Sequence, residues 1–145
     1  MIKTCKFCRI ISGELPASMV LEDEFCVAFL DSRPLFHGHC LLLPRSHYET
    51  LMDLPDSLIL SLFSDAKLLC RAVEEAMGAE GTLVAINNKI SQSVPHLHVH
   101  VVPRRRKDGL RGFFWPRHRY TDEEQMNEVA ERIGAAVGEL RIMNC

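Results

Sequence analysis

Polar and apolar residues alternate most clearly in the stretch HLHVHVV, residues 96–102. In an extended strand successive side chains point to opposite faces, so this stretch predicts a strand with one apolar and one polar side. We expect the apolar side to pack in the core; it comprises Leu97, Val99 and Val101. The polar side carries the imidazoles of His96, His98 and His100. Because histidine is an uncommon choice for a merely solvated surface, we interpret this side as the wall of a functional site.

Four shorter apolar runs, bounded by turn residues, predict further strands. They span residues 17–21, 25–30, 39–43 and 82–88. Strands joined by short turns favour antiparallel pairing, and they argue against a parallel, doubly wound sheet. The sequence also has no glycine-rich phosphate loop.

Apolar residues at helical spacing predict three helices. Residues 7–12 form a short one that Gly13 ends. A long helix has Pro55 in its first turn and ends at Gly78. Its apolar stripe comprises Leu58, Ile59, Leu62, Ala66, Leu69, Cys70, Val73 and Met77.

The last helix begins at a capping box formed by Thr121 and Glu124. We expect its apolar stripe to be buried; it comprises Met126, Val129, Ala130, Ile133, Val137 and Leu140. Both long stripes predict helices that pack on a sheet. The chain is therefore predicted to have an α+β fold, an antiparallel sheet of about five strands with a long central helix and a C-terminal helix. We expect one domain over residues 1–145, a length that can bury a sizeable core.

Composition adds little to the fold but bears on the compartment. The chain is 47% hydrophobic and 25% charged, which is ordinary for a globular protein. It has no apolar run long enough for a membrane span, and its start lacks the apolar core of a signal peptide, so we expect a cytoplasmic protein. Its six cysteines are then expected to be reduced thiols. Cys26, Cys40 and Cys70 fit apolar patterns as core residues, and Cys145 is a terminal thiol.

The three imidazoles are expected to divide their work. Neighbouring ones, two residues apart on a strand, lie about 6.5–7 Å apart and can share a metal ion, whereas the outer two are about 13 Å apart and cannot. A neutral imidazole is also a nucleophile near pH 7, and flanking imidazolium or amide donors can stabilise a phosphoryl group under attack. Separately, Cys5 and Cys8 have the spacing of a zinc-binding pair, which needs two further ligands.

The HLHVHVV stretch matches the signature of the histidine triad (HIT) superfamily of nucleotide hydrolases and transferases. The upstream elements D-x-x-P-x-x-x-G-H, from Asp31 to His39, and P-x-x-H, from Pro44 to His47, stand in the expected order. The chain resembles the family over most of residues 5–104. The resemblance implies a HIT-like fold and a two-fold homodimer.

The resemblance also assigns roles to single residues. It makes His98 the nucleophile that attacks the α-phosphorus of a nucleotide, with His100 and Gln92 on the phosphoryl oxygens and Ser93 at the leaving atom. It places Asp31 on the ribose hydroxyls, a role that suits a carboxylate. The resemblance also places four further residues in or beneath the nucleotide site: Phe7, Ile10, His39 and Asn87. The implied ligands of a structural zinc ion are Cys5, Cys8, His47 and His96.

Simpler interpretations remain open at several of these positions. Phe7 and Ile10 also suit core packing, and Asp31 also suits the start of a turn. His39 is either a residue of the turn before its strand or a support beneath the triad. The loop before the triad departs from the family pattern, because Ser91 stands where glycine is usual and the loop is short. A less permissive backbone leaves the placement of Asn87 or Asn88 open.

Residues 104–119 are strongly basic, although the whole chain carries a net charge of −2. The cations are Arg104, Arg105, Arg106, Lys107, Arg111, Arg117 and Arg119. The segment is either a solvated loop or a funnel for a polyphosphate, and we favour a substrate with several phosphates or an anionic leaving group. Binding of single-stranded nucleic acid is a secondary interpretation. Trp115 suits either a dimer contact or the pocket rim.

The expected function is therefore a hydrolase that releases a nucleoside monophosphate, with AMP the favoured product, from a phosphoramidate or a dinucleoside polyphosphate. No catalytic metal is required in this scheme. Two other functions stay open: a nucleotide-binding module without turnover, and a zinc-dependent hydrolase in which His98 and His100 hold the metal. The sequence does not choose among the leaving groups.

Overall fold

The computed structural model describes residues 2–110 and 117–143. By internal contacts the chain forms two compact units, Met1–Asp108 and Gly109–Cys145, which are described separately. Cys145 lies outside the described residues. The assignment of the whole chain to one domain therefore stays a prediction.

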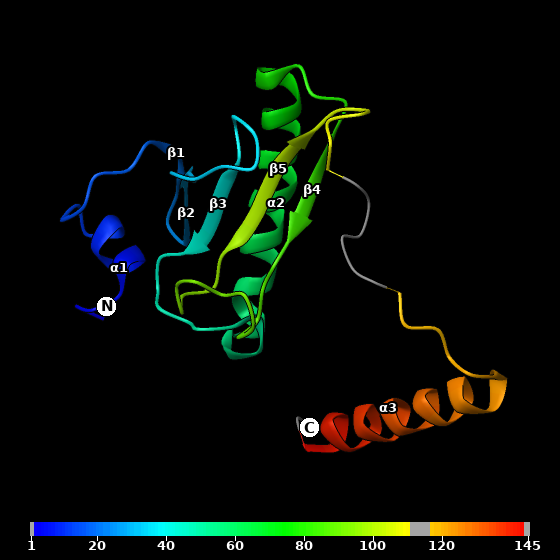
Figure 1. Cartoon of the computed structure of the whole chain (residues 1–145). Coiled ribbons are helices and arrows are strands. Elements are labelled where there is room, and N and C mark those ends of the chain that lie inside the picture. Colours follow the sequence, from blue (N-terminus) through cyan, green and yellow to red (C-terminus); the bar gives the residue numbers. More distant parts are fainter. Residues whose placement is uncertain (1, 111–116, 144–145) are drawn as a thin grey trace. The chain divides into compact units, whose positions relative to one another are not determined.

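A five-stranded sheet forms the body of the first unit, in the order β1-β2-β3-β5-β4 (Figure 1). Each neighbouring pair is antiparallel. The strands are β1 (Met19–Glu22), β2 (Cys26–Leu30), β3 (Cys40–Pro44), β4 (Gly81–Ala85) and β5 (Val99–Arg104). The predicted α+β fold with an antiparallel sheet is confirmed.

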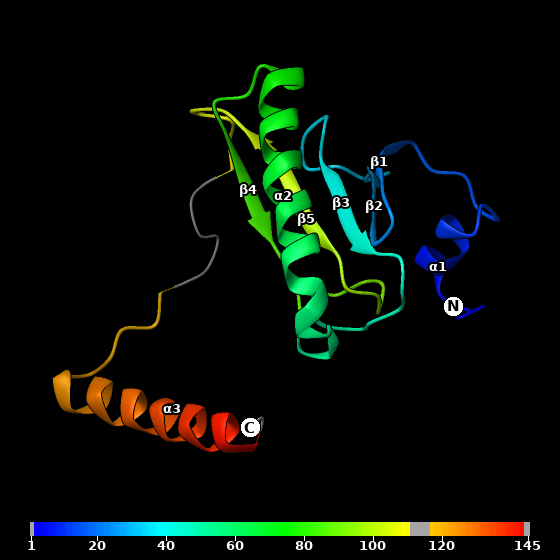
Figure 2. The ribbon, with the colours of Figure 1, turned by 180° about the vertical axis from the view of Figure 1, so that it is seen from behind.

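Two helices cover the sheet from opposite sides. The long helix α2 (Asp56–Met77) lies along one face, as both ribbon views show (Figures 1 and 2). Its core cluster includes Cys26, Ala28, Cys40 and Leu42. The short helix α1 (Lys6–Ile11) packs on residues of the other parity in β2 and β3, which are Val27, Phe29, Leu41 and Leu43. Burial on both faces explains why these two strands are apolar throughout rather than alternating.

The segment around β5 alternates as its sequence predicts. Leu97, Val99 and Val101 are fully buried in the cluster under α2. Leu41 of β3 is the register partner of His100, so these two side chains share the opposite face, which belongs to the site. The regular strand begins at Val99, three residues later than the alternation begins.

The ends of α2 follow glycine and proline chemistry. Gly78 has a left-handed φ of 58°, and its N–H donates to the carbonyls of Glu74 and Glu75, which confirms the predicted helix end. Pro55 stands just before the first helical residue and not within the first turn. The buried side of the helix is formed by Leu62, Ala66, Leu69 and Val73. A short 3-10 turn, η1 (Leu51–Asp53), precedes the helix.

Strand β4 is shorter than predicted. It begins at Gly81 and ends at Ala85, and residues 86–88 leave the sheet. The carboxamide oxygen of Asn88 accepts a hydrogen bond from the N–H of Leu51 at 2.9 Å. The Asn88 side chain thus ties the segment after β4 to the start of the 3-10 turn η1.

The second unit contains helix α3 (Glu123–Met143). Its start is capped differently from the prediction: Asp122 accepts the N–H of Gln125, and the Gln125 side chain accepts the N–H and hydroxyl of Thr121, so Glu124 does not close a box. The predicted buried stripe is exposed except for Val129, which is half-buried, and no described residue of α3 is buried. The reason is that no second layer exists within the described residues of this unit. No described helix is long and apolar enough to cross a membrane.

Candidate functional site

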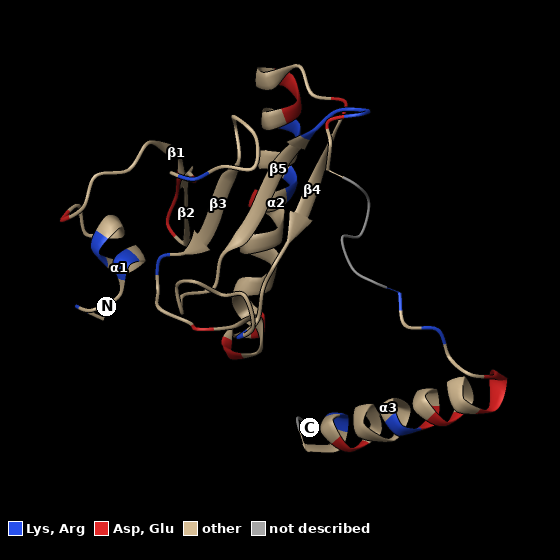
Figure 3. Cartoon of the chain, in the orientation of Figure 1, with Lys and Arg blue, Asp and Glu red and all other residues tan. Residues whose placement is uncertain are grey.

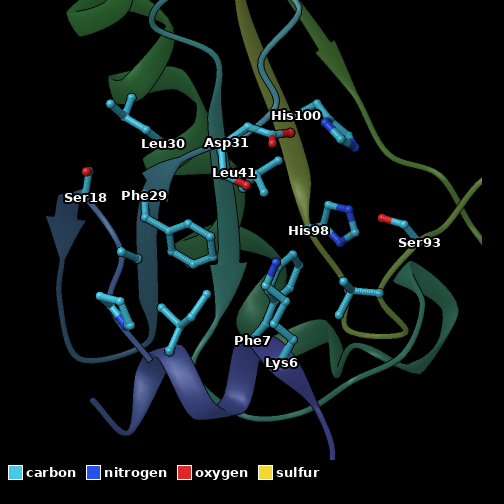
Figure 4. A pocket seen from close by; sticks show the side chains of 15 residues that line it. Lys6, Phe7, Ser18, Phe29, Leu30, Asp31, Leu41, Ser93, His98 and His100 are labelled. Carbon is cyan, nitrogen blue, oxygen red and sulfur yellow. The ribbon is translucent and has the colours of Figure 1, made fainter. Parts of the chain in front are cut away.

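A cavity of about 590 Å³ lies between α1, the ends of β1 and β2, and the segment that enters β5 (Figure 4). Six of the predicted site residues line it: Phe7, Ile10, Asp31, Ser93, His98 and His100. His39 is buried behind His100 and does not line the cavity. The fold thus brings most of the sequence-predicted nucleotide contacts to one hollow.

The ring of His98 is oriented by the backbone of its own strand. Its Nδ1 lies 2.7 Å from the carbonyl oxygen of His96. A carbonyl only accepts, so Nδ1 must carry a proton and donate it, which leaves Nε2 of a neutral ring with its lone pair free. The edge of the Phe7 ring contacts His98, with ring centroids 5.1 Å apart at 88°. The middle imidazole is therefore held in one orientation on the cavity wall.

His100 is oriented by a chain of two hydrogen bonds. The N–H of Leu35 donates to Nδ1 of His39 at 3.1 Å, so the proton of the neutral His39 ring sits on Nε2. That Nε2 lies 2.9 Å from Nδ1 of His100 and donates to it. Nδ1 of His100 is consequently an acceptor, and its Nε2 carries the proton. His100 is prepared to donate a hydrogen bond to an oxygen in the cavity.

Burial keeps both of these rings uncharged. It lowers the pKa of His100 to about 4, with repulsion from His98 and His39 adding to the effect. Burial also lowers the pKa of His39, although the carboxylate of Asp31, 3.8 Å from its Nε2, opposes the shift. In this structure His39 and His100 are thus neutral hydrogen-bond donors at neutral pH.

Asp31 stabilises its own turn and also lines the cavity. Its Oδ1 accepts the N–H of Arg33 at 2.9 Å, which is the turn bond expected after β2. The residue also lines the cavity, and its other carboxylate oxygen is the one that approaches His39. The two interpretations of Asp31 left open by the sequence are therefore compatible.

The loop before β5 places its predicted residues unequally. Ser93 lines the cavity, but Gln92 and Asn87 do not. The Gln92 carboxamide is engaged with the loop itself, accepting the N–H of Lys89 at 2.8 Å and donating to the Glu49 carbonyl at 2.5 Å. Asn87 donates to the carbonyl of Ser91 at 3.4 Å. Lys89 and Ser91 both have positive φ, 70° and 59°, so the loop takes the tight path that glycine would ease.

Several lining residues were not foreseen from the sequence. Among them are Lys6, Ser18, Phe29, Leu41 and Val94. Phe29 could have been found because it lies two residues before Asp31, on the same face of β2. Leu41 follows from its pairing with His100. Lys6 carries no pattern of its own, and its position depends on how α1 docks.

The four predicted zinc ligands come together beside this cavity. One ligand atom from each of Cys5, Cys8, His47 and His96 lies within 4.8 Å of the others. Nδ1 of His96 is 3.6 Å from both sulfurs, and the Sγ of Cys8 is 3.4 Å from Nδ1 of His47. Tetrahedral zinc with ordinary bond lengths would place sulfur and nitrogen ligands about 3.6 Å apart, so the donor set fits this ion.

The outward nitrogen of His96 completes the arrangement. Its Nε2 lies 2.8 Å from the carbonyl oxygen of Pro44, to which it donates a proton. The lone pair of Nδ1 therefore points at the two thiols, as a metal ligand requires. Burial lowers the pKa of His96 to about 4, so this ring is neutral at physiological pH. His96 is buried completely and lies outside the nucleotide cavity, which agrees with the expected division of work.

Residues 104–106 of the basic segment do not line this cavity. Arg104 pairs with Asp108, Arg105 donates to the carbonyls of Met77 and Gly78, and Arg106 pairs with Glu80. Figure 3 shows these cations at the end of β5 farthest from α1. Arg105 thereby caps the C-terminus of α2. Arg111, Phe113, Phe114 and Trp115 lie outside the described residues.

Comparison with known proteins identifies the family. The HIT domain model matches residues 12–107. Adenylylsulfatase HINT3 of Arabidopsis thaliana is 38% identical over 108 residues, which are 73% of this chain and 55% of that protein. Adenosine 5'-monophosphoramidase HNT1 of Saccharomyces cerevisiae is 38% identical over 109 residues, which are 73% of this chain and 66% of that protein. The chain thus spans little more than half of the plant relative.

Solved structures agree with this match. The crystal structure of SMU.412c from Streptococcus mutans has a TM-score of 0.86 at 32% identity and covers 94% of this chain and 87% of that one. A zinc-bound histidine triad family protein from Mycobacterium smegmatis has a TM-score of 0.71 at 34% identity, covering 94% and 97%. With two histidines of its HLHVHVV stretch on the cavity wall and a family model over most of its first unit, the chain belongs to the HIT family.

Proposed function

We propose that this HIT protein is a nucleotide hydrolase that works through a nucleotidyl-histidine intermediate. The observation that carries the proposal is the orientation of His98, whose Nδ1–H is bound to the His96 carbonyl, so that in the neutral ring the lone pair is on Nε2. A histidine with a fixed tautomer is a competent nucleophile at neutral pH. The relatives named adenylylsulfatase and adenosine 5'-monophosphoramidase support this class of reaction.

In the first step, Nε2 of His98 forms a bond to the α-phosphorus of the nucleotide. The bond from phosphorus to the leaving atom breaks, and its electron pair stays on that atom. The positive charge gained by the ring is stabilised through Nδ1–H by the carbonyl of His96. Ser93, which lines the cavity, donates a hydrogen bond to the departing atom.

His100 stabilises the phosphoryl oxygens while this happens. Its neutral ring presents Nε2–H, because Nδ1 is occupied by His39. In the second step water attacks the phosphorus, the bond to Nε2 breaks, and a nucleoside monophosphate and free His98 are restored. Gln92 acts from a distance in this scheme: its carboxamide holds the loop that carries Ser93.

The remaining walls suit a nucleoside. Phe7, Ile10 and Phe29 provide an apolar slot, and the T-shaped pair of Phe7 and Phe29, with centroids 5.5 Å apart, makes it rigid. Asp31 accepts hydrogen bonds from the ribose hydroxyls. Both named relatives act on AMP derivatives, and we therefore propose adenosine as the nucleoside.

We further propose a structural zinc ion held by Cys5, Cys8, His47 and His96. The donor separations and the neutral, correctly oriented His96 ring support it, as does the zinc-bound relative. When bound, the ion would join α1 to the entrance of β5 and keep both thiols deprotonated. No step of the reaction requires it.

The decisive experiment measures AMP released from adenosine phosphoramidate, adenylyl sulfate and diadenosine polyphosphates, with His98→Asn beside the unaltered protein. We expect release from at least one substrate, a loss of at least about a thousandfold in the variant, and a trapped adenylyl group on His98 by mass spectrometry. Binding without release would instead identify a nucleotide-binding module. Loss of activity in a metal-stripped, still folded sample would favour a zinc-dependent hydrolase.

A further inference from the structure

A second cavity, of about 400 Å³, adjoins the nucleotide cavity. The two share three lining residues, Lys6, Ser93 and Val94. In Figure 4, Ser93 lies on the opposite side of His98 from Phe29, which belongs to the slot assigned to the nucleoside. The second cavity therefore begins on the side where a leaving group would depart from the α-phosphorus.

Lys6 is the one Lys or Arg side chain in the wall of either cavity among the described residues. It extends from α1 along the cavity wall, beside Phe7 (Figure 4). Within the described part of the chain, no carboxylate lies within ion-pair distance of its ammonium group. Glu49 lines only the second cavity. The ammonium of Lys6 is thus available to a ligand at the junction.

We propose that Lys6 is a specificity-determining residue that favours nucleotides whose leaving group is a tetrahedral oxyanion, such as a phosphate or a sulfate, seated in the second cavity. This inference rests on the proposed function and names its substrate class. Amine leaving groups are disfavoured by the same charge.

The chemistry of the first step gives the reason. When the leaving group is an oxyanion, the breaking bond transfers its electron pair to the bridging oxygen, and negative charge grows on the leaving group. A nearby ammonium stabilises this charge more in the transition state than in the ground state. When the leaving group is an amine, its nitrogen takes a proton from solvent water as the bond breaks and gains no negative charge, so the ammonium gives no such stabilisation.

Arg104, Arg105 and Arg106 of the basic segment do not provide this stabilisation. The described arginines nearest the sheet, Arg104, Arg105 and Arg106, are engaged with Asp108, the end of α2 and Glu80. The basic segment first suggested a preference for an anionic leaving group. We now attribute this preference to Lys6.

The test compares kcat/KM for adenylyl sulfate and for diadenosine tetraphosphate with kcat/KM for adenosine phosphoramidate. The variants are Lys6→Gln, which removes the charge, Lys6→Glu, which reverses it, and Lys6→Arg, which keeps it. Lys3→Gln is the matched control, because Lys3 is an exposed lysine of the same segment that lines neither cavity. Circular dichroism and melting temperature verify that each variant is folded.

We expect Lys6→Gln to lower the ratio of oxyanion to amine substrates about fivefold, the size of an exposed charge interaction. Lys6→Glu should lower it further, Lys6→Arg should preserve it, and the effect should shrink at high salt. Glu49→Gln should raise the ratio. The sulfate and tetraphosphate arms tell which oxyanion is preferred.

An unchanged ratio in Lys6→Gln and Lys6→Glu, with AMP still released by the unaltered protein, overturns the role of Lys6 and leaves the proposed function standing. An equal loss on all three substrates also overturns it, because it would show a general effect on binding. If the unaltered protein releases AMP from none of them, the proposed function itself is wrong.

Discussion

Nε2 of His39 lies 2.9 Å from Nδ1 of His100, and the N–H of Leu35 binds the other nitrogen of His39. A backbone amide outside the cavity thereby decides which nitrogen of His100 carries the proton. His39 is therefore a positioning residue in the proposed reaction, since it acts on the phosphate only through His100.

The first prediction concerns this relay. His39→Phe removes the donor to His100, so the His100 ring can adopt either tautomer, and kcat should fall about tenfold or more. His39→Gln keeps an N–H donor and should retain more activity. The discriminating measurement is the nitrogen NMR spectrum of His100, which should show a proton on Nε2 in the unaltered protein and a mixture of tautomers in His39→Phe. An unchanged spectrum would contradict the relay.

The second prediction concerns stability and pH. The pKa of His100 is lowered to about 4 in the folded chain, whereas that of an unfolded histidine is about 6.5. Between these values the unfolded chain binds more protons, so the contribution is complete above about pH 6.5 and is lost as pH falls through about 4. Urea unfolding at pH 7 and pH 4.5 should show a fall that His100→Asn reduces by about 1–2 kcal/mol.

A control for this measurement is His37→Asn, because His37 is an exposed histidine of the same unit. This variant should show the same fall as the unaltered protein. If His100→Asn and the unaltered protein lose equal free energy between the two pH values, burial of the neutral ring does not contribute to stability.

The third prediction concerns the Cys5, Cys8, His47 and His96 cluster. Purified protein should contain about one zinc ion per chain, and Cys8→Ser should reduce the content and lower the melting temperature by about 10 °C or more. Cys70→Ser is the matched control, since this half-buried cysteine lies outside the cluster. Metal analysis and thermal melting with and without a chelator provide the measurement. If the protein contains no zinc and the chelator has no effect, the four residues pack together without binding a metal ion.

The fourth prediction concerns the homodimer, which the resemblance implies and a single chain does not test. β4 is at the edge of the sheet with Val84 exposed, and Leu60 on α2 is 78% exposed, so both offer apolar surface to a second copy. Light scattering should give twice the chain mass of 16.5 kDa. Leu60→Glu should weaken the dimer, whereas Ile90→Glu, on an exposed loop, should not. A monomer mass for the unaltered protein would make the prediction wrong.

Much of the site could be predicted because it depends on strand parity. The alternation of residues 96–102 assigns each side chain to a face, whereas the grouping of Cys5, Cys8 and His47 with His96 was implied by the family resemblance. The end of α2 could also be predicted from the sequence, since Gly78 adopts a left-handed conformation that other residues avoid.

Prediction and structure differ where a side chain binds a partner other than the one expected. Gln92 has the right chemistry for a phosphate, yet its carboxamide binds the Glu49 carbonyl, a partner 43 residues away that the sequence does not place. Likewise, the hydroxyl of Thr121 donates to the side chain of Gln125, whereas a capping box with Glu124 was expected. Lys6 was missed because its position depends on the docking of α1, which is a tertiary property.

The coverage of β2 and β3 from both sides, by α1 and by α2, limits how this chain can vary. A polar replacement at either parity of these two strands would place an unsolvated group in a packed layer. Around β5 both parities are buried as well, but one of them carries histidines and not only apolar side chains. Related proteins should therefore change most slowly in β2 and β3, because these strands need apolar side chains of a given volume. The triad should also change slowly, because its proposed role needs nitrogen atoms at fixed positions.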